Sequence, residues 1–350
     1  MWHVFFLLKA NPRTRIRCLS CRAAYFVNPK NTSLIIFLFA GVAASAAMPG
    51  ARLSRKQEQQ AAPIRVQSNF VLVEATVKDK SGKIVDGLTT DDFRVNDDGF
   101  PQTVAYFSQD ELPVAVALVV DVSESIVPYF DQLSDSMATV LPTLKPEDQV
   151  ALFTFSNIVE KRADLTTDKG VIAGRLAGLT VGGSTNLNDA IHEAARYLGE
   201  RAPTMRRVII LVSDNIPSQE GKFSPKEVEN EIVKADAALY SLKIPGENSY
   251  GVQRYIEQAH GQLVNIDKLV PNTGGEIIDV SKNGSLAPAF ITIIQRLKAR
   301  YTLGYTPIGH PLQDGKYHSV GVLVAREHCK NCRVETKRGY FGVLPPGAKK

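Results

Sequence analysis

Apolar runs of strand length alternate with helical patterns between residues 112 and 299 of this 350-residue chain, and this alternation limits the possible folds strongly. The runs Val114–Val120 and Val208–Val212 contain only apolar residues, as expected for strands buried on both faces of a sheet. Residues 127–141 and 186–198 repeat apolar residues at helical spacing. Strands that alternate with helices predict a parallel sheet covered on both faces. We therefore expect a doubly wound, mostly parallel α/β domain over residues 112–299.

The segments on either side of this domain, residues 64–111 and 300–344, have β character and show no helical period. Asn96-Asp97-Asp98-Gly99 is a strong hairpin signal. Neither flank is large enough for a stable core of its own. We therefore expect them to pair into one small β-sandwich-like module, with the α/β domain inserted between them. Strand patterns lie at residues 70–77, 93–95, 102–107, 300–306, 317–325 and 333–341.

The N-terminal region has the pattern of a secretory signal. Residues 34–47 read LIIFLFAGVAASAA, with basic residues upstream and small residues at the end. We expect residues 1–47 to be a signal peptide and the polar residues 48–63 to be a linker. The apolar run is short for a bilayer span, which needs about 20 residues. An uncleaved N-terminal anchor stays open as the alternative, and it would be the membrane contact. The expected location is the periplasm, the cell surface or the medium.

The net charge of +5 is weak evidence for a nucleic-acid partner. Six basic residues lie before the apolar run, and most of the excess charge would leave with the signal peptide. The sequence shows no basic stripe interleaved with aromatic residues, so we expect no nucleic-acid binding.

Four cysteines form two C-x-x-C pairs. Cys18 and Cys21 lie in the expected signal segment. Cys329 and Cys332 lie near the C-terminus, where an oxidising compartment permits a small disulfide across a hairpin tip. Free thiols or a metal site are the alternatives for this second pair.

Five oxygen-bearing residues are expected to meet at one edge of the sheet. Two of them are carboxylates that follow buried strands, and a threonine lies in a Gly-rich loop before a helix. In open parallel sheets, ligands collect outside the carboxyl ends of the strands. Residues two apart in an extended segment point the same way, so the first three can face one point. The five residues are Asp121, Ser123, Ser125, Thr185 and Asp214.

Three hydroxyls and two carboxylates offer only oxygen ligands, and the two carboxylates balance a divalent charge. Mg²⁺ prefers such ligands and keeps several waters, while Mn²⁺ or Ca²⁺ are the alternatives. If some ligands bind through water, the metal can accept a carboxylate from a partner. Asp and Ser after a strand are also ordinary helix N-caps, which is the competing interpretation for single members such as Ser125 or Thr185.

The motif D-x-S-x-S, followed by Thr in a Gly-rich loop and Asp after a hydrophobic strand, resembles the metal-ion-dependent adhesion site of the von Willebrand factor A family. More narrowly, the chain is similar to the VWFA-related proteins typical of acidobacteria over about residues 66–341. The motifs that carry this narrower resemblance are Leu88-Thr89-Thr90-Asp91-Asp92-Phe93, Tyr301-Thr302-Leu303-Gly304-Tyr305 and Lys337-Arg338-Gly339-Tyr340. The resemblance implies a Rossmann-like VWA domain and an exported adhesion protein that binds a protein or another macromolecule.

Two positions depart from the family pattern. Asn215 follows Asp214 where Gly is common, but Asn tolerates positive φ better than most residues. Glu124 fills a position that often holds a small residue, and it adds a carboxylate beside the predicted metal.

We expect no catalysis. The sequence contains no G-x-S-x-G nucleophile elbow and no H-E-x-x-H zinc helix. His310 and His318 lie in the C-terminal β region, away from the five predicted ligands. Two other interpretations stay open: a structural cell-envelope module whose metal site is vestigial or purely stabilising, and a metal-dependent hydrolase.

Overall fold

The computed structural model describes residues 70–109, 112–246, 255, 259, 261–282, 284–325, 329 and 331–343. The predicted signal peptide, residues 1–47, and the predicted linker, residues 48–63, lie outside these described residues. Within the described ranges, no helix is both long enough and apolar enough to cross a membrane.

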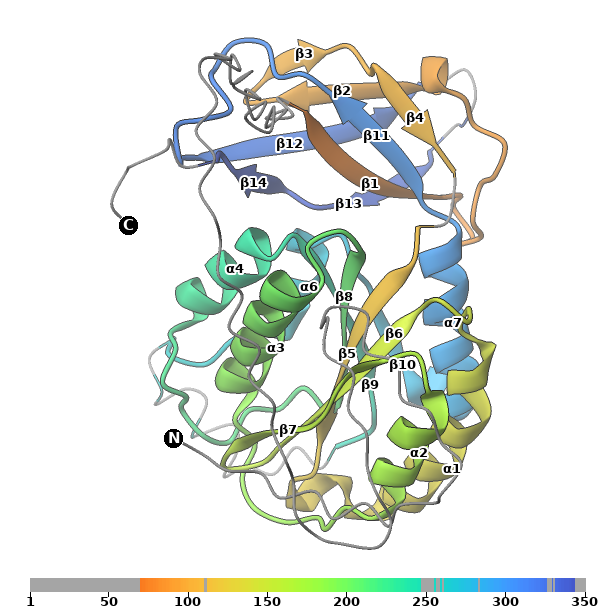
Figure 1. Cartoon of the computed structure of the whole chain (residues 1–350), viewed down its shortest axis with the longest axis vertical. Helices are drawn as coiled ribbons and strands as arrows, with labels where there is room; N and C mark the ends of the chain where they lie inside the picture. The colour runs from red at the N-terminus through yellow and green to blue at the C-terminus, as the bar shows by residue number, and fades with distance from the viewer. Residues whose placement is uncertain are drawn as a thin grey trace, which may run out of the picture. The chain divides into compact units, whose positions relative to one another are not determined.

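A six-stranded sheet lies at the centre of the α/β domain (Figure 1). Its strands are β5 (Val114–Asp121), β6 (Gln149–Phe155), β7 (Val159–Thr166), β8 (Arg206–Ser213), β9 (Ala237–Lys243) and β10 (Ile277–Asp279). The strand order is β10-β9-β8-β5-β6-β7. All neighbours pair in parallel except β7, which pairs antiparallel with β6 at one edge. The predicted doubly wound, mostly parallel sheet is confirmed.

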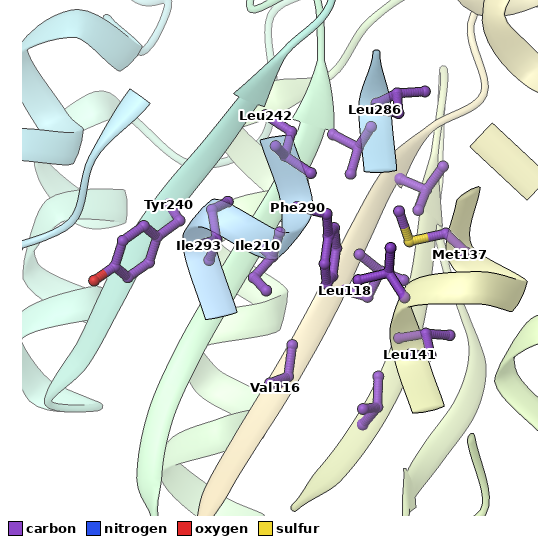
Figure 2. Close-up of a cluster of buried hydrophobic side chains, with 14 of the residues drawn as sticks. Val116, Leu118, Met137, Leu141, Ile210, Tyr240, Leu242, Leu286, Phe290 and Ile293 are labelled. Atoms are coloured by element: carbon purple, nitrogen blue, oxygen red, sulfur yellow. The ribbon is translucent and has the colours of Figure 1, made fainter. Parts of the chain in front are cut away.

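Helices cover both faces of this sheet (Figure 1). They are α1 (Phe130–Val140), α2 (Lys169–Ala177), α3 (Leu187–Arg201), α4 (Pro225–Lys234), α6 (Ile266–Asn272) and α7 (Leu286–Lys298). Side chains of α1, α2 and α7 share one buried cluster with the sheet, and those of α3, α4 and α6 share another. Figure 2 shows Leu118 of β5 in the first cluster, among Met137 of α1 and Phe290 of α7.

Strand β5 is buried along all eight residues, because it lies between β6 and β8 and both of its faces are covered. Its alternate residues differ in size. Val116, Leu118 and Val120 face the cluster of α1 and α7. Ala115 and Ala117 face the other cluster, where alanines of α3 also pack. Small residues on both sides let α3 lie close to the central strand, and this sets the position of the α3 N-terminus near the sheet edge.

The two β flanks pair with each other, as predicted. The strands are β1 (Val71–Lys78), β2 (Phe93–Asp97), β3 (Phe100–Gln102), β4 (Tyr106–Ser108), β11 (Tyr301–Tyr305), β12 (Tyr317–Val324), β13 (Arg333–Thr336) and β14 (Gly339–Phe341). They form two antiparallel sheets, β13-β1-β11-β4 and β14-β12-β2-β3, which share one buried core. We call these two sheets the β module. The N-terminal β1 and β2 pair with the C-terminal β11 and β12.

Two expected strands are wrong, because each divides between the two sheets. Residues 333–341 form β13, which pairs with β1, and β14, which pairs with β12. Residues 102–107 were expected to return as a single strand after the hairpin. Instead, β3 pairs with β2 in one sheet, and β4 pairs with β11 in the other. Alternating polar and apolar residues identify extended chain, but they do not say to which of two packed sheets each half belongs.

The helix expected at residues 127–141 also starts later. A 3-10 helix, η2, runs over Glu124–Tyr129, and α1 begins at Phe130. Pro128 lies inside η2, where its missing N–H and fixed φ oppose a continuous α-helix.

The sequence patterns did not predict β7 or α2. Strand β7 is charged and partly exposed, as edge strands often are.

A charge cluster with two buried arginines and the half-buried Glu74 joins the β module to the α/β domain. Glu74 of β1 accepts hydrogen bonds from Arg206 Nε at 2.5 Å and from Arg300 Nη1 at 2.8 Å. Arg300 also donates to the Tyr240 hydroxyl and to the Gly274 carbonyl oxygen. Burial alone would raise the pKa of Glu74, but the two arginines outweigh it and lower this pKa to about 2.

We expect Glu74→Gln to lower the free energy of unfolding by about 3 kcal/mol at neutral pH, because two buried arginines lose their counter-charge. The folded-state pKa lies below the ordinary value of 4.5, so this stabilisation is complete above about pH 4.5 and is lost as pH falls toward 2. Urea unfolding across this range should show the wild type and the variant converging in acid.

The control is Glu193→Gln, which breaks a surface pair with Arg196. It should change stability by less than about 1 kcal/mol. A Glu74→Gln variant that matches this control at neutral pH would refute the role of Glu74.

Candidate metal centre

The predicted ligands lie on three segments at the carboxyl edge of the central sheet. Asp121 is the last residue of β5, and Asp214 directly follows β8, the parallel neighbour of β5. Thr185 lies two residues before α3. Asp121 and Thr185 are buried, Asp214 is 3% exposed, and Ser123 is 1% exposed. Ser125 is half-buried.

Backbone hydrogen bonds tie these segments together. The Gly182 amide donates to the Val122 carbonyl at 2.7 Å, and the Glu124 amide donates to the Gly183 carbonyl at 3.2 Å. On the other side, the Thr185 amide donates to the Ser218 hydroxyl at 2.9 Å. The Gly-rich loop therefore lies between the loop after β5 and the loop after β8, and the structure brings the five predicted residues to one edge.

The loop after β5 is ordered around the Asp121 carboxylate. The Ser123 amide donates to Oδ1 at 2.9 Å, and the Ser213 hydroxyl donates to Oδ2 at 2.7 Å. The hydroxyl oxygens of Ser123 and Ser125 lie 3.2 Å apart. Alternate residues of this loop therefore face the same side, as the D-x-S-x-S spacing predicts.

The electrostatics of the edge favour a cation. Burial and, to a smaller extent, the nearby Asp214 carboxylate outweigh the hydrogen bonds from Ser123 and Ser213, and together they raise the pKa of Asp121 to about 6. Asp121 therefore lies in an environment that disfavours its negative charge. A divalent cation would offset both carboxylates, and the oxygen-only donor set suits Mg²⁺.

The helix-capping interpretation does not account for the Ser123 and Thr185 hydroxyls. Ser123 stands at the N-cap position of η2, but its side chain makes no capping hydrogen bond. The N-cap of α3 is Asn186, whose side chain accepts from the Asp189 amide. Neither the Ser123 hydroxyl nor that of Thr185 therefore caps these helices.

The segment around Asp214 is fixed by Asn215, which the sequence analysis singled out, and by Ile216 and Gly246, which it did not. Asn215 has a φ of 64°, so the expectation that Asn replaces Gly in a left-handed position is confirmed. The Ile216 amide donates to Asp214 Oδ1 at 2.9 Å. Gly246, which follows β9, lies so close that a Cβ there would be 2.5 Å from the Cβ of Asp214. The only sequence signal at this position is the Pro245-Gly246 pair after a strand, and such a pair predicts a turn but not a contact with Asp214.

Glu124, the acidic residue that departs from the family pattern, is exposed at the start of η2.

The sulfur atoms of Cys329 and Cys332 are joined as a disulfide, with Cα atoms 5.6 Å apart.

A second polar cluster lies in the β module. His310 and His318 are indeed on the C-terminal β segment, but the fold brings them to Asp97 and Asp98 of the N-terminal hairpin. Potential ligand atoms of these four residues lie within 4.8 Å of one another. The sequence showed Asn96–Gly99 as a turn signal only, and nothing local links it to histidines more than two hundred residues away.

Residues 116–217 match the family model of the von Willebrand factor type A domain. This part of the chain is therefore similar to a von Willebrand factor type A domain, and we call the α/β domain the VWA domain. It contains all five predicted ligands. The 26S proteasome non-ATPase regulatory subunit 4 of Drosophila melanogaster is 27% identical over 151 residues, which cover 42% of this chain and 36% of that protein. This chain thus spans little more than a third of that curated relative.

Solved structures also resemble the chain. The SpRpn10 VWA domain is 19% identical, with 48% of this chain and 88% of that chain covered and a TM-score of 0.34. Proximal thread matrix protein 1 from the mussel byssus, described with a zinc-occupied MIDAS motif, is 17% identical, with 58% and 50% covered and a TM-score of 0.41. An aerotolerance-related membrane protein from Bacteroides fragilis NCTC 9343 is 17% identical, with 53% and 98% covered and a TM-score of 0.41. Likeness at this level carries no argument about function.

We expect Gly246→Ala to weaken Mg²⁺ binding by about 10–100-fold, because the new methyl group displaces Asp214, and residues that orient metal ligands matter on this scale. Calorimetric titration would measure the change. The matched control is Gly174→Ala in α2, where a Cβ meets nothing within 4 Å. Equal affinities in both variants would show that the position of Asp214 does not matter for metal binding.

Proposed function

We propose that this protein is an exported, non-catalytic binding protein that engages a macromolecular partner through a divalent metal at the carboxyl edge of its VWA domain. The ligands are Asp121, Ser123, Ser125, Thr185 and Asp214. One observation carries the proposal: three loops, tied by hydrogen bonds, present oxygen donors around Asp214 and around Asp121, whose negative charge is disfavoured by burial. A metal held in this way can take a partner carboxylate as a further ligand.

The surface beside the edge supports the binding of a large partner. A groove of about 700 Å³ starts at Asp214. Ile216, Pro217 and Asn265 are among its lining residues, so it offers both apolar and polar contacts next to the metal ligands. A partner carboxylate on the metal would place the rest of the partner over this groove.

Two features support the export part of the proposal. The N-terminal sequence has the pattern of a secretory signal. The Cys329–Cys332 disulfide suits an oxidising compartment, such as the periplasm or the cell surface.

We also propose that the chain belongs to the VWFA-related proteins typical of acidobacteria. The motif residues that carry this resemblance have structural roles in the β module. Thr89 and Asp92 form a capping box at the 3-10 helix η1 (Thr90–Asp92). The rings of Phe93 and Tyr301 pack with centroids 5.1 Å apart, and the Tyr301 hydroxyl donates to the Val85 carbonyl at 2.9 Å. These motifs therefore specify the module that carries the VWA domain.

One observation favours a second function, a structural envelope module with a purely stabilising metal. Both carboxylate oxygens of Asp121 already accept hydrogen bonds within the protein. Such a module predicts a metal with no exchangeable ligand, whereas the binding protein predicts an open coordination position.

We expect saturable Mg²⁺ and Mn²⁺ binding by the wild type in calorimetric titration, and loss of this binding in Asp121→Ala and in the shape-preserving Asp121→Asn. The control Asp135→Ala removes an exposed carboxylate of α1 and should bind as the wild type does. A folded wild type that binds neither cation would overturn the metal-dependent proposal.

Water-proton relaxation of the Mn²⁺-loaded protein separates the two functions. We expect a bound, exchangeable water whose signal falls when acetate is added as a carboxylate probe. Partner capture should then be lost on chelation and in Asp121→Asn. A tightly held metal without exchangeable water would favour the structural module.

A further inference from the structure

We infer that the β module holds a second metal site, for a first-row transition cation such as Zn²⁺, built from Asp97, Asp98, His310 and His318. These four residues come from two distant parts of the chain. Asp97 ends β2 and Asp98 begins the turn before β3, whereas His310 lies in the segment before β12 and His318 lies in β12 itself. Imidazole and carboxylate ligands suit Zn²⁺ and its neighbours, in contrast to the oxygen-only set at the VWA edge.

The ligand atoms are already gathered. His310 Nε2 lies 3.0 Å from Asp97 Oδ1 and 4.0 Å from Asp98 Oδ2. His318 Nδ1 lies 2.8 Å from Asp98 Oδ2. Bonds of about 2.0 Å in a tetrahedral zinc site place ligand atoms about 3.3 Å apart. The three distances given above bracket this value, but the two rings are stacked in parallel, so at least one imidazole has to rotate before both nitrogens can bind the same ion.

The hairpin geometry explains how two consecutive residues serve one site. Neighbouring residues of an extended strand point to opposite faces of the sheet. Asp97 ends β2, but Asp98 has a φ of 48° and begins the turn. This left-handed conformation interrupts the alternation, and both carboxylates reach the same pair of histidines.

The atoms that would not bind the metal have partners that orient the ligands. Asp97 Oδ2 accepts hydrogen bonds from the Tyr305 and Tyr340 hydroxyls, each at 2.8 Å. Asp98 Oδ1 accepts from the Ser319 amide at 2.8 Å. His318 Nε2 lies 3.0 Å from the Asp314 carboxylate. A carboxylate behind a ligating histidine is the usual second layer of a zinc site.

The burial of the four side chains and their charges also favour a bound cation. The Asp97 side chain is fully buried, the His318 side chain is 4% exposed, and the His310 side chain is 12% exposed. The two imidazole rings stack with centroids 3.8 Å apart and an interplanar angle of 8°. Three carboxylates, those of Asp97, Asp98 and Asp314, surround these rings. A divalent cation would neutralise the two ligating carboxylates and leave Asp314 to orient His318.

The site would connect the two flanks of the inserted VWA domain. Asp97 and Asp98 precede the domain, whereas His310 and His318 follow it. A metal bound to the folded protein alone stabilises it by mass action. Bound zinc would therefore link the N-terminal and C-terminal parts of the β module and stabilise their pairing.

The test uses the full chain with the Asp121→Ala substitution, so that the VWA-edge site does not contribute. The protein carries no polyhistidine tag, and a chelator removes bound metal before the measurement. We expect one Zn²⁺ to bind per chain, Co²⁺ to give the intense absorption of a tetrahedral site, and Zn²⁺ to raise the midpoint of thermal unfolding.

His310→Ala should abolish all three effects, and Asp314→Asn should weaken Zn²⁺ binding by about 10–100-fold. His192→Ala, which removes another largely buried imidazole, should bind Zn²⁺ like its parent. Circular dichroism would check that each variant is folded. No Zn²⁺ binding by the folded parent, or equal binding by His310→Ala, would overturn the proposal and leave a hydrogen-bonded His–Asp cluster. Neither result bears on the Mg²⁺ site.

Discussion

Glu74 lies between Arg206 and Arg300 where the β module meets the VWA domain. Buried charges are costly unless they are paired. Here one carboxylate pairs with two guanidinium groups, and Arg300 makes further hydrogen bonds to Tyr240 and to the Gly274 carbonyl. The chain leaves the module before β5 and returns to it at β11, so these contacts fix the geometry of the insertion at both its entry and its exit.

The predicted metal ligands gather at the carboxyl edge of the parallel sheet. The carboxyl ends of β5 and β8 lie side by side, and the loops that follow them carry Asp121 and Asp214. The α3 N-terminus brings Thr185 to the same edge. The ion pairs of Glu74 lie at the opposite edge of the sheet, because Arg206 is at the amino end of β8. The sheet therefore separates the attachment of the β module from the predicted metal edge.

The two candidate metal sites differ in their chemistry because their scaffolds differ. The VWA edge is built from strand-to-helix loops that present hydroxyls and carboxylates, an oxygen-only set that suits Mg²⁺ with some of its waters retained. The cluster of the β module is built from a tight hairpin and an adjacent strand, with both histidines largely buried. The first arrangement suits exchange of a ligand, and the second suits permanent closure of a fold.

Local patterns in the sequence determined the type of the main elements and the set of predicted oxygen ligands. Buried strands such as Val114–Val120 are continuous apolar runs, and the ligand spacing lies within short segments that repeat a known motif. The tertiary structure alone decided the split of residues 102–107 between two sheets, the approach of Gly246 to Asp214, and the meeting of Asp97 with His310. Each of these depends on contacts between residues that are distant in sequence or on the choice between two packed sheets, and periodicity contains no information about either.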